Sequence, residues 1–473
     1  MKNIVLIDRY VGSELELARP LSGKSDIEIV LLVVDNESQK LALKGVSNIK
    51  QIVTVAEIDK YGSMDGLDYK TILDCRMDQV VVENALTRFE SDYNIRKYVY
   101  YCSLSFWNKI FSVNKVDVIF VNDGLHGLPY DGLLKSMAKK YNAVMYTSIM
   151  IGVNRWARLI FNETNHCLEE IKNNLPVENV MYYLKNEKED VLHIHVDGNI
   201  YHRKDNTLKS CLKRFVYFIG GALGVEIVQG VFGGNLFKKR LFTSNGFYTN
   251  PVIKLKCYLK VLWYQRYLKK CEVCQIEDIN YIFFPLHIEP EATTQCRLTM
   301  ESQLIVLKML SESVPEGWMI YVKEHPYHFK MNTMVCSYFL HNLDLFKTKK
   351  FYQKIASMKN VKLISHKISS DELVKKSRAV ASLMGSVFLE ATLYKKPILM
   401  FSEYHPLTMN VETLNCFSYS DCQKAIDKIK NGFIPTYSDI LGTTNRYICS
   451  SATDFINNSL RIINRFSGDY YEN

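Results

Sequence analysis

Short apolar runs alternate with longer amphipathic stretches in the first third of the chain. A continuous apolar run is typical of a parallel strand that is buried on both faces. Five such runs are Ile4–Ile7, Ile27–Val34, Ile52–Val55, Val116–Val121 and Ala143–Thr147. Residues 78–112 and Tyr130–Tyr141 have helix-like composition. This alternation predicts a doubly wound α/β domain.

A second alternation of the same kind occupies the C-terminal half. Its strand-like runs are Tyr281–Phe284, Trp318–Lys323, Val361–Ile364, Arg378–Leu383 and Pro397–Phe401. Helices are expected over Met300–Ser313 and Val387–Tyr394, and Ser369–Glu372 has the pattern of a capping box that begins another helix. The half therefore predicts a second doubly wound domain.

The two alternations together predict an α/β protein with two Rossmann-like domains that face a cleft. The first domain is expected at residues 1–185 and the second at residues 276–435. Residues 186–275 would form a basic helical insertion and linker, and residues 436–473 would form closing helices. A chain of 473 residues with 47% hydrophobic content is large enough for two cores.

The cysteines and the first residues indicate a reducing compartment. The chain has 12 cysteines, and Cys271 and Cys274 form the only close pair. Because no second pair at zinc-ligand spacing follows, a zinc ribbon is excluded and free cysteines are expected. The apolar run after Met1 is too short for a signal peptide. We therefore expect a cytoplasmic protein.

The excess positive charge is confined to one segment. Residues 201–275 hold 14 Lys and Arg against 3 Asp and Glu, a balance of +11, so the rest of the chain carries 9 − 11 = −2. Phe215–Phe237 is long enough to span a bilayer, but Glu226, Gln229 and six glycines argue against a membrane span. The segment predicts peripheral contact with an anionic inner-membrane surface. The alternative is a basic helical insertion that packs on the protein.

Polar residues follow the predicted strand ends, where open α/β sheets bind their ligands. Lys323, Glu324, His325 and Pro326 end one strand of the second half. Pro326 cannot continue the ladder, and His325 could donate a hydrogen bond to a phosphate. The alternative for His325 is a loop histidine that is satisfied by a neighbouring carbonyl.

A second group of this kind follows the predicted strand Arg378–Leu383. Gly385 permits close approach of the backbone, Ser386 adds a donor at a helix N-terminus, and Glu390 could accept from ribose hydroxyls. The alternative is an N-cap serine with a solvated glutamate. No Walker motif and no dinucleotide-binding glycine fingerprint is present in the sequence.

A third group lies in the first half, after Val116–Val121. Asn122, Asp123 and Gly124 place a carboxylate at a strand end before a turn glycine, which suits a general base or nucleophile. An ordinary Asp-Gly turn is the alternative.

Phe284–Thr294, Tyr321–Pro326 and Gly385–Pro397 resemble the C-terminal half of bacterial capsular-polysaccharide glycosyltransferases. These are similar to Kdo transferases and bacterial sialyltransferases of GT-B fold, which use CMP-sugar donors. The resemblance covers residues 277–405, and residues 116–147 more loosely. It implies that His325 and Ser386 contact the nucleotide phosphate. It also implies that Asp123 is catalytic, although Asn122 replaces the first acid of the family's motif.

The resemblance implies a glycosyltransferase that moves an ulosonic or sialic-type acid from a CMP-activated donor to a surface-polysaccharide or lipid-linked glycan. No metal is expected, since no Asp-x-Asp motif is present to hold one. No other cofactor and no nucleic-acid partner are expected. Two alternatives stay open: a polyol-phosphate transferase with a CDP-linked donor, and a non-catalytic polysaccharide-assembly protein. Further candidates for donor or acceptor contacts are His126, His287, Glu289, Glu291, Thr293 and Thr294.

Overall fold

The computed structural model describes two compact units. The described residues are 1–9, 17–58, 64–88, 90, 92–122, 124–150, 158–171, 263–264, 266–289, 294, 300, 302–325, 346–385, 387–402, 412–436, 448–449 and 452–465. Unit 1 holds those up to residue 171 and those from residue 448 on, and unit 2 holds residues 263–436. The predicted basic insertion lies almost entirely outside the described residues, so its contact with a membrane stays a prediction.

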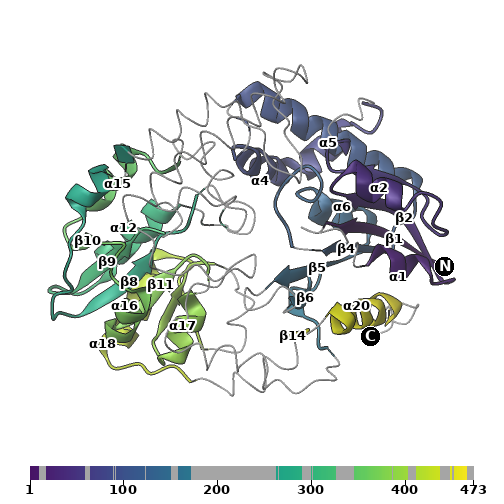
Figure 1. Ribbon diagram of the computed structural model, residues 1–473. Coiled ribbons are helices and arrows are strands. Elements are labelled where there is room, and N and C mark those ends of the chain that lie inside the picture. The colour runs from purple at the N-terminus through teal and green to yellow at the C-terminus, as the bar shows by residue number, and fades with distance from the viewer. Residues whose placement is uncertain are drawn as a thin grey trace, which may run out of the picture. The chain divides into compact units, whose positions relative to one another are not determined.

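Unit 1 is built on a mostly parallel sheet (Figure 1). Its strands are β1 (Lys2–Asp8), β2 (Ile27–Val34), β3 (Ile52–Thr54), β4 (Val118–Asn122), β5 (Val144–Met150), β6 (Arg158–Asn162), β7 (Cys167–Leu168) and β14 (Ile448–Cys449). The order is β14-β6-β5-β4-β1-β2-β3, with β7 paired to β6. From β3 to β5 all pairs are parallel, and β6, β7 and β14 pair antiparallel.

Helices complete the core of unit 1. They are α1 (Ala18–Ser22), α2 (Glu37–Ala42), α3 (Tyr69–Asp74), α4 (Arg76–Leu86), α5 (Tyr93–Val113), α6 (Leu134–Tyr141) and α20 (Ala452–Arg465). Leu17 and Leu21 at α1, with Phe455 and Ile463 of α20, pack on the alternate strand residues that include Ile4, Leu6 and Phe120. Residues 452–465 therefore close the core of the sheet that the first residues begin.

Unit 2 is built on a fully parallel sheet in the order β10-β9-β8-β11-β12-β13. Its strands are β8 (Tyr281–Pro285), β9 (Met319–Lys323), β10 (Val361–Ile364), β11 (Ala379–Ser382), β12 (Ile398–Met400) and β13 (Leu414–Asn415). Its helices are α12 (Gln303–Ser313), α15 (Lys349–Ala356), α16 (Ser370–Lys376), α17 (Val387–Leu393) and α18 (Tyr419–Lys430).

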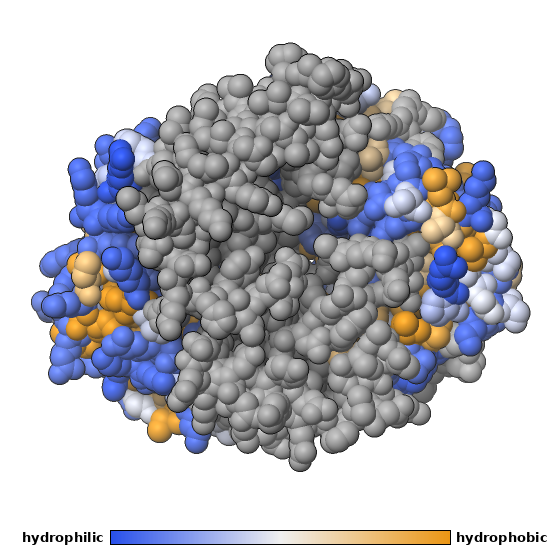
Figure 2. Space-filling view, viewed as in Figure 1, coloured by the Kyte–Doolittle hydropathy of each residue, from blue (hydrophilic) through white to orange (hydrophobic). Residues whose placement is uncertain are grey.

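One face of the second sheet packs on α12, α15 and α18, and its core includes Phe284, Ile320, Leu307, Ile355 and Ile426. On the other face α16 and α17 meet the sheet; the Tyr281 hydroxyl donates to the Leu373 carbonyl of α16 over 2.8 Å. Where described residues are in view, the outer surface in Figure 2 is largely hydrophilic. The apolar runs from which strands were predicted supply many of the buried residues of the two cores.

In each sheet the first strand of the unit lies between the second and the fourth. This is the 3-2-1-4-5 order of a Rossmann sheet, and its ligand crevice lies at the carboxyl ends of the first and fourth strands. Those strands are β1 and β4 in unit 1, and β8 and β11 in unit 2. The prediction of two Rossmann-like α/β units is confirmed.

Two local predictions need correction, and a third is made more precise. Residues 78–112, predicted to be helical, lie in the two helices α4 and α5, and Asp92 starts α5 by accepting hydrogen bonds from the Asn94 and Ile95 amides. Ser369 precedes α16 as expected, but its side chain makes no capping hydrogen bond. Within residues 436–473, Ile448 and Cys449 form a strand, whereas only helices were expected.

Neither disulfides nor spanning helices are found in the described part of the chain. No disulfide joins the eight cysteines that the structure describes. Of the helices described, none is both long and apolar enough to cross a membrane.

Candidate functional site

His287 and the turn at Gly385 meet at the switch point of unit 2. His287 follows β8, and Ser382, Met384 and Gly385 end β11 and enter α17. The Met384 amide donates to His287 Nε2 over 3.2 Å, and Ser382 Oγ lies 3.2 Å from the same nitrogen. Gly385 has φ +123°, a conformation that side chains rarely adopt. The structure thus brings together two groups that the sequence placed on separate strand ends.

Lys323 and Glu390 belong to the same edge of the sheet. Lys323 is the last residue of β9, and Glu390 lies in the first turn of α17. Lys323 Nζ donates to the Ile368 carbonyl over 2.6 Å and to Ser370 Oγ over 2.9 Å. Glu390 is 6% exposed, so its interpretation as a solvated glutamate is wrong. Its Oε2 atom has no hydrogen-bond partner among the described residues. Burial raises the pKa of Glu390 to about 7, opposed by the charge of Lys323 and reinforced by that of Asp371.

The raised pKa predicts a pH-dependent stability. The unfolded chain loses the Glu390 proton near pH 4.5, whereas the folded protein keeps it up to about pH 7. The free energy of unfolding should therefore fall as pH rises through this window, by up to about 3 kcal/mol at 1.36 kcal/mol per unit.

Glu390→Gln cannot ionise, so it should escape that loss. Urea unfolding of both proteins at pH 5 and pH 8, without nucleotide, measures the difference. The advantage of the variant should grow toward pH 8. Parallel pH dependences would contradict the burial of an ionisable Glu390.

The residue before His325 is the centre of a buried ion pair. Glu324 and Lys347 are each 1% exposed, and their Oε1 and Nζ atoms lie 3.4 Å apart. Glu324 Oε2 accepts from the Tyr352 hydroxyl over 2.5 Å, and Oε1 accepts from the His325 amide over 2.7 Å. These contacts fix the backbone at His325, the predicted phosphate contact.

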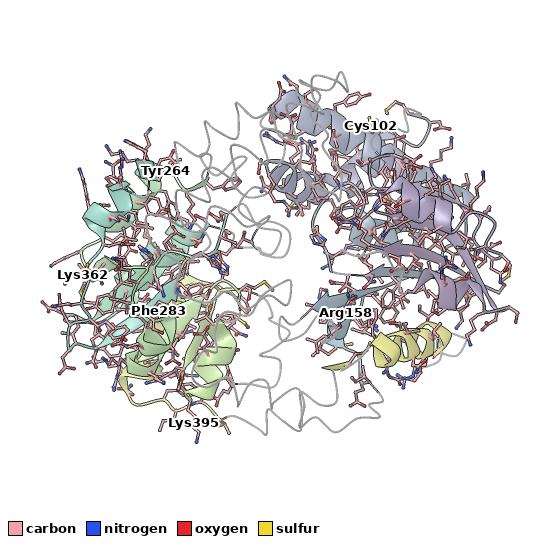
Figure 3. The ribbon with its side chains drawn as sticks, viewed as in Figure 1. Cys102, Arg158, Tyr264, Phe283, Lys362 and Lys395 are labelled. Atoms are coloured by element: carbon pink, nitrogen blue, oxygen red, sulfur yellow. The ribbon has the colours of Figure 1, made fainter. Side chains whose placement is uncertain are left out.

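In unit 1 the switch point holds a buried polar network around Asn122. Asn122 Nδ2 donates to Asp8 Oδ1 over 3.0 Å across the β1–β4 pair. Asn122 Oδ1 accepts from Ser148 Oγ over 2.9 Å and from Arg158, which stands on β6 (Figure 3). The Arg158 guanidinium also lies 4.9 Å over the Phe455 ring of α20. Asn122 is therefore a buried structural side chain rather than an open ligand contact.

Asp8 joins this network to the start of α1. Its Oδ2 accepts from the Leu17 and Ala18 amides over 3.0 and 2.8 Å. Burial raises the pKa of Asp8, whereas the hydrogen bonds from Asn122 and from the two amides, and the charge of Arg158, lower it.

The loop after Asn122 is held by Asp131. This 1% exposed carboxylate accepts from the His126 and Leu128 amides over 2.6 and 2.8 Å, and the His126 ring lies 3.5 Å from it. Arg88 donates to the His126 carbonyl. Gly124 has φ +72°, a left-handed conformation that favours glycine. Asp123 itself lies outside the described residues.

Of the other predicted site residues, some are described by the structure and some are not. Pro326, Ser386, Glu291 and Thr293 lie outside the described residues. Thr294 is described and is 1% exposed. Glu289 acts electrostatically on the buried Tyr352, whose pKa burial raises well above its usual value, so Glu289 lies on the side of the Glu324 network.

Sequence reasoning missed Asp8, Asp35, Lys347 and Arg158. Asp8 and Asp35 each directly follow an apolar strand, the signal that selected Asn122, so they could have been found. Asp35 accepts from Arg9 Nε over 2.6 Å, and Arg9 stacks 4.2 Å over the Tyr130 ring. Lys347 and Arg158 carry no such signal, because their partners are distant in the sequence.

No group of three or more His, Cys, Asp or Glu side chains that could hold a metal is found among the described residues. The expectation of a metal-independent protein is not tested by this finding and stays a prediction.

No protein-family model matches the sequence, and no curated protein matches it. Among solved structures, UDP-GlcNAc 2-epimerase from Methanocaldococcus jannaschii aligns with 98% of this chain and 100% of its own, at 13% identity and a TM-score of 0.25. KpsC, a β-Kdo 2,7-transferase of Thermosulfurimonas dismutans, covers 92% and 100% at 10% identity and 0.30. A UDP-forming α,α-trehalose-phosphate synthase from Burkholderia vietnamiensis covers 98% and 100% at 7% identity and 0.30. Because these TM-scores are low, the assignment of two Rossmann-like units rests on the strand order itself.

Proposed function

We propose that the protein is a glycosyltransferase of the GT-B type. It would transfer an ulosonic or sialic-type acid from a CMP-activated donor to a surface-polysaccharide or lipid-linked glycan. The observation that carries this proposal is the switch point of unit 2, where His287 and Gly385 meet beside Lys323 and Glu390. The GT-B arrangement, in which two such units face a cleft, is part of the proposal.

The donor nucleotide would bind at the carboxyl edge of the second sheet. Gly385 lets a phosphate approach the backbone, and Ser386 and His325 would donate hydrogen bonds to it. Lys323 would add positive charge at the strand end, although its ammonium is 2.6 Å from the Ile368 carbonyl and so is held on the protein. Glu390 would accept from the ribose hydroxyls, and a small local movement would have to expose its buried carboxylate.

The acceptor hydroxyl would be activated from unit 1. Asp123 would take the hydroxyl proton as a general base in an inverting reaction, or attack the anomeric carbon in a retaining one. Its position is supported by its two neighbours, Asn122 in the buried network and Gly124 in the left-handed region. His126, Glu289, Glu291, Thr293 and Thr294 remain candidates for contacts to donor or acceptor.

A nucleotide panel tests the donor class. CMP should raise the free energy of unfolding by about 2.7 kcal/mol at a hundredfold excess over its dissociation constant. EDTA should leave the effect unchanged, because no metal is expected at the phosphate. Thermal unfolding with CMP, CDP, UDP and GDP measures it. Stabilisation by UDP or GDP alone would exclude the CMP donor. In a turnover assay, reaction of a CDP-polyol alone would favour the alternative of a polyol-phosphate transferase.

His325→Ala is the matched variant for that panel. It should weaken CMP binding by roughly 1.5–3 kcal/mol, the range for a hydrogen bond to a charged group. Glu324 Oε1 accepts from the backbone amide of His325, a hydrogen bond that the alanine variant keeps, so the fold should survive. A folded variant with wild-type CMP affinity would return His325 to the role of a loop histidine.

A further inference from the structure

The backbone of His287 is fixed on both sides. The preceding residue, Leu286, extends the β8–β9 pairing by donating its amide to the Lys323 carbonyl over 2.8 Å. The His287 amide itself donates to Gln303 Oε1, at the start of α12, over 2.9 Å. His287 as a whole is 8% exposed. His287 is therefore built into the sheet edge, with little ring surface left for a ligand.

Two side chains hold both backbone polar groups of Met384. Its amide donates to His287 Nε2 over 3.2 Å, and its carbonyl accepts from Ser382 Oγ over 2.7 Å. A ring nitrogen that accepts from an amide cannot itself carry a proton. The contact therefore selects the neutral tautomer with the proton on Nδ1.

The next residue lies against the same ring. A Cβ atom placed on Gly385 would lie 3.6 Å from His287 Cε1, so the turn packs on the imidazole. With φ +123° at Gly385, the direction of the following backbone depends on how Met384 is held. The Met384 amide is the point at which β8 constrains this turn.

We propose that His287 is the positioning residue of the Gly385 turn. Its neutral Nδ1–H tautomer holds the Met384 amide and so sets the backbone that leads into α17. The effect on nucleotide binding rests on the proposed function, in which this turn receives the donor phosphate. The proposal removes His287 from the candidates for direct contact with donor or acceptor.

The ring tautomer is the first test, and it needs no nucleotide. Long-range ¹H–¹⁵N correlation of the histidine rings, assigned by comparison with His287→Gln, should show a protonated Nδ1 and an unprotonated Nε2 for His287. A proton on Nε2 would overturn the proposal, because that nitrogen could not accept from Met384.

Two substitutions then separate positioning from packing. His287→Leu fills the site but leaves the Met384 amide without an acceptor, whereas His287→Gln can offer Oε1 in place of Nε2. CMP affinity should fall about tenfold or more in the Leu variant, as it would if no more than about a tenth of the molecules kept the turn in its binding conformation. It should return to within about threefold of wild type in the Gln variant, because Gln restores the acceptor for the Met384 amide.

Ser382→Ala is the matched control, because it releases the other backbone polar group of Met384. Its effect on CMP affinity and that of His287→Leu should be less than additive in the double variant. In all variants the Gly385 amide resonance should shift in proportion to the loss of affinity. Additive effects would mean that the two side chains do not act together on the backbone of Met384.

The remaining outcomes distinguish the two proposals. If wild type binds no CMP, the proposed function fails, and the tautomer and the Gly385 resonance still decide the positioning role. If a folded His287→Leu binds CMP as wild type does, the positioning role fails and the proposed function stands. A folded Gln variant as weak as the Leu variant would mean that the imidazole contacts the ligand. If His287→Leu does not fold, the tautomer and the Gln variant decide.

Discussion

Asp123→Asn is expected to lower turnover by at least the roughly 10²–10⁴-fold ascribed to general acid–base catalysis. The substitution keeps the shape of the side chain and removes the group that would take the acceptor proton or attack the anomeric carbon. Its neighbours should hold it in place, since Asn122 is fixed by Asp8, Ser148 and Arg158 and Gly124 has a left-handed backbone conformation. Steady-state turnover of a CMP-sugar with a glycan acceptor measures the effect.

CMP affinity is the control for this variant. It should stay close to wild type, because the donor nucleotide would bind on unit 2 and Asp123 belongs to unit 1. Glu289→Gln and Glu291→Gln should be assayed beside it as the competing carboxylates. If Asp123→Asn is active and Glu291→Gln is inactive, the catalytic carboxylate would instead be assigned to the loop after β8.

Glu324→Leu should destabilise unit 2 by about 3–5 kcal/mol, the loss that follows when one partner of a buried ion pair is removed. Lys347 is 1% exposed and would keep its charge without a carboxylate, and the Tyr352 hydroxyl would lose its acceptor. Urea unfolding monitored by intrinsic fluorescence gives the free-energy difference.

The double variant Glu324→Leu with Lys347→Met is the matched control. Replacing both ions by apolar side chains of similar volume should recover most of the loss, because no uncompensated charge remains. A single Glu324→Leu within about 1 kcal/mol of wild type would show that Lys347 reaches water and that the pair is not buried.

The strands that were predicted are mainly apolar and mostly buried. Ile27–Val34 forms β2 with the predicted bounds. Of the strands that were missed, β7, β13 and β14 have two residues each, whereas β6 has five buried residues but an apolar run of only three. Ile448–Cys449 has two residues and becomes a strand only because β6 pairs with it, a contact that local composition does not encode.

The site could be predicted only as far as strand ends. His287 and Gly385 were each identified from their loops, but their contact depends on β8 and β11 being neighbours. The alternative of a solvated Glu390 was wrong. Residue spacing places Glu390 on a helix but does not show which face of that helix is covered. The polar network at Asn122 was missed because Arg158 is 36 positions away in the sequence. Asn122 itself had been interpreted as a possible ligand contact.

The late arrival of β14 and α20 in unit 1 has a consequence for synthesis on the ribosome. Lys2 Nζ of the first strand donates to the Ile463 carbonyl of α20 over 2.8 Å. This contact can form only after one of the last helices has been synthesised. Between Ile171 and Ile448 the ribosome must add 277 residues, which takes roughly 15–60 s at 5–20 residues per second. For that time the surface around Ile4, Leu6 and Phe120 lacks the cover of Phe455 and Ile463. We therefore expect the nascent first unit to expose apolar surface of the kind that chaperones bind until residues 452–465 have been made.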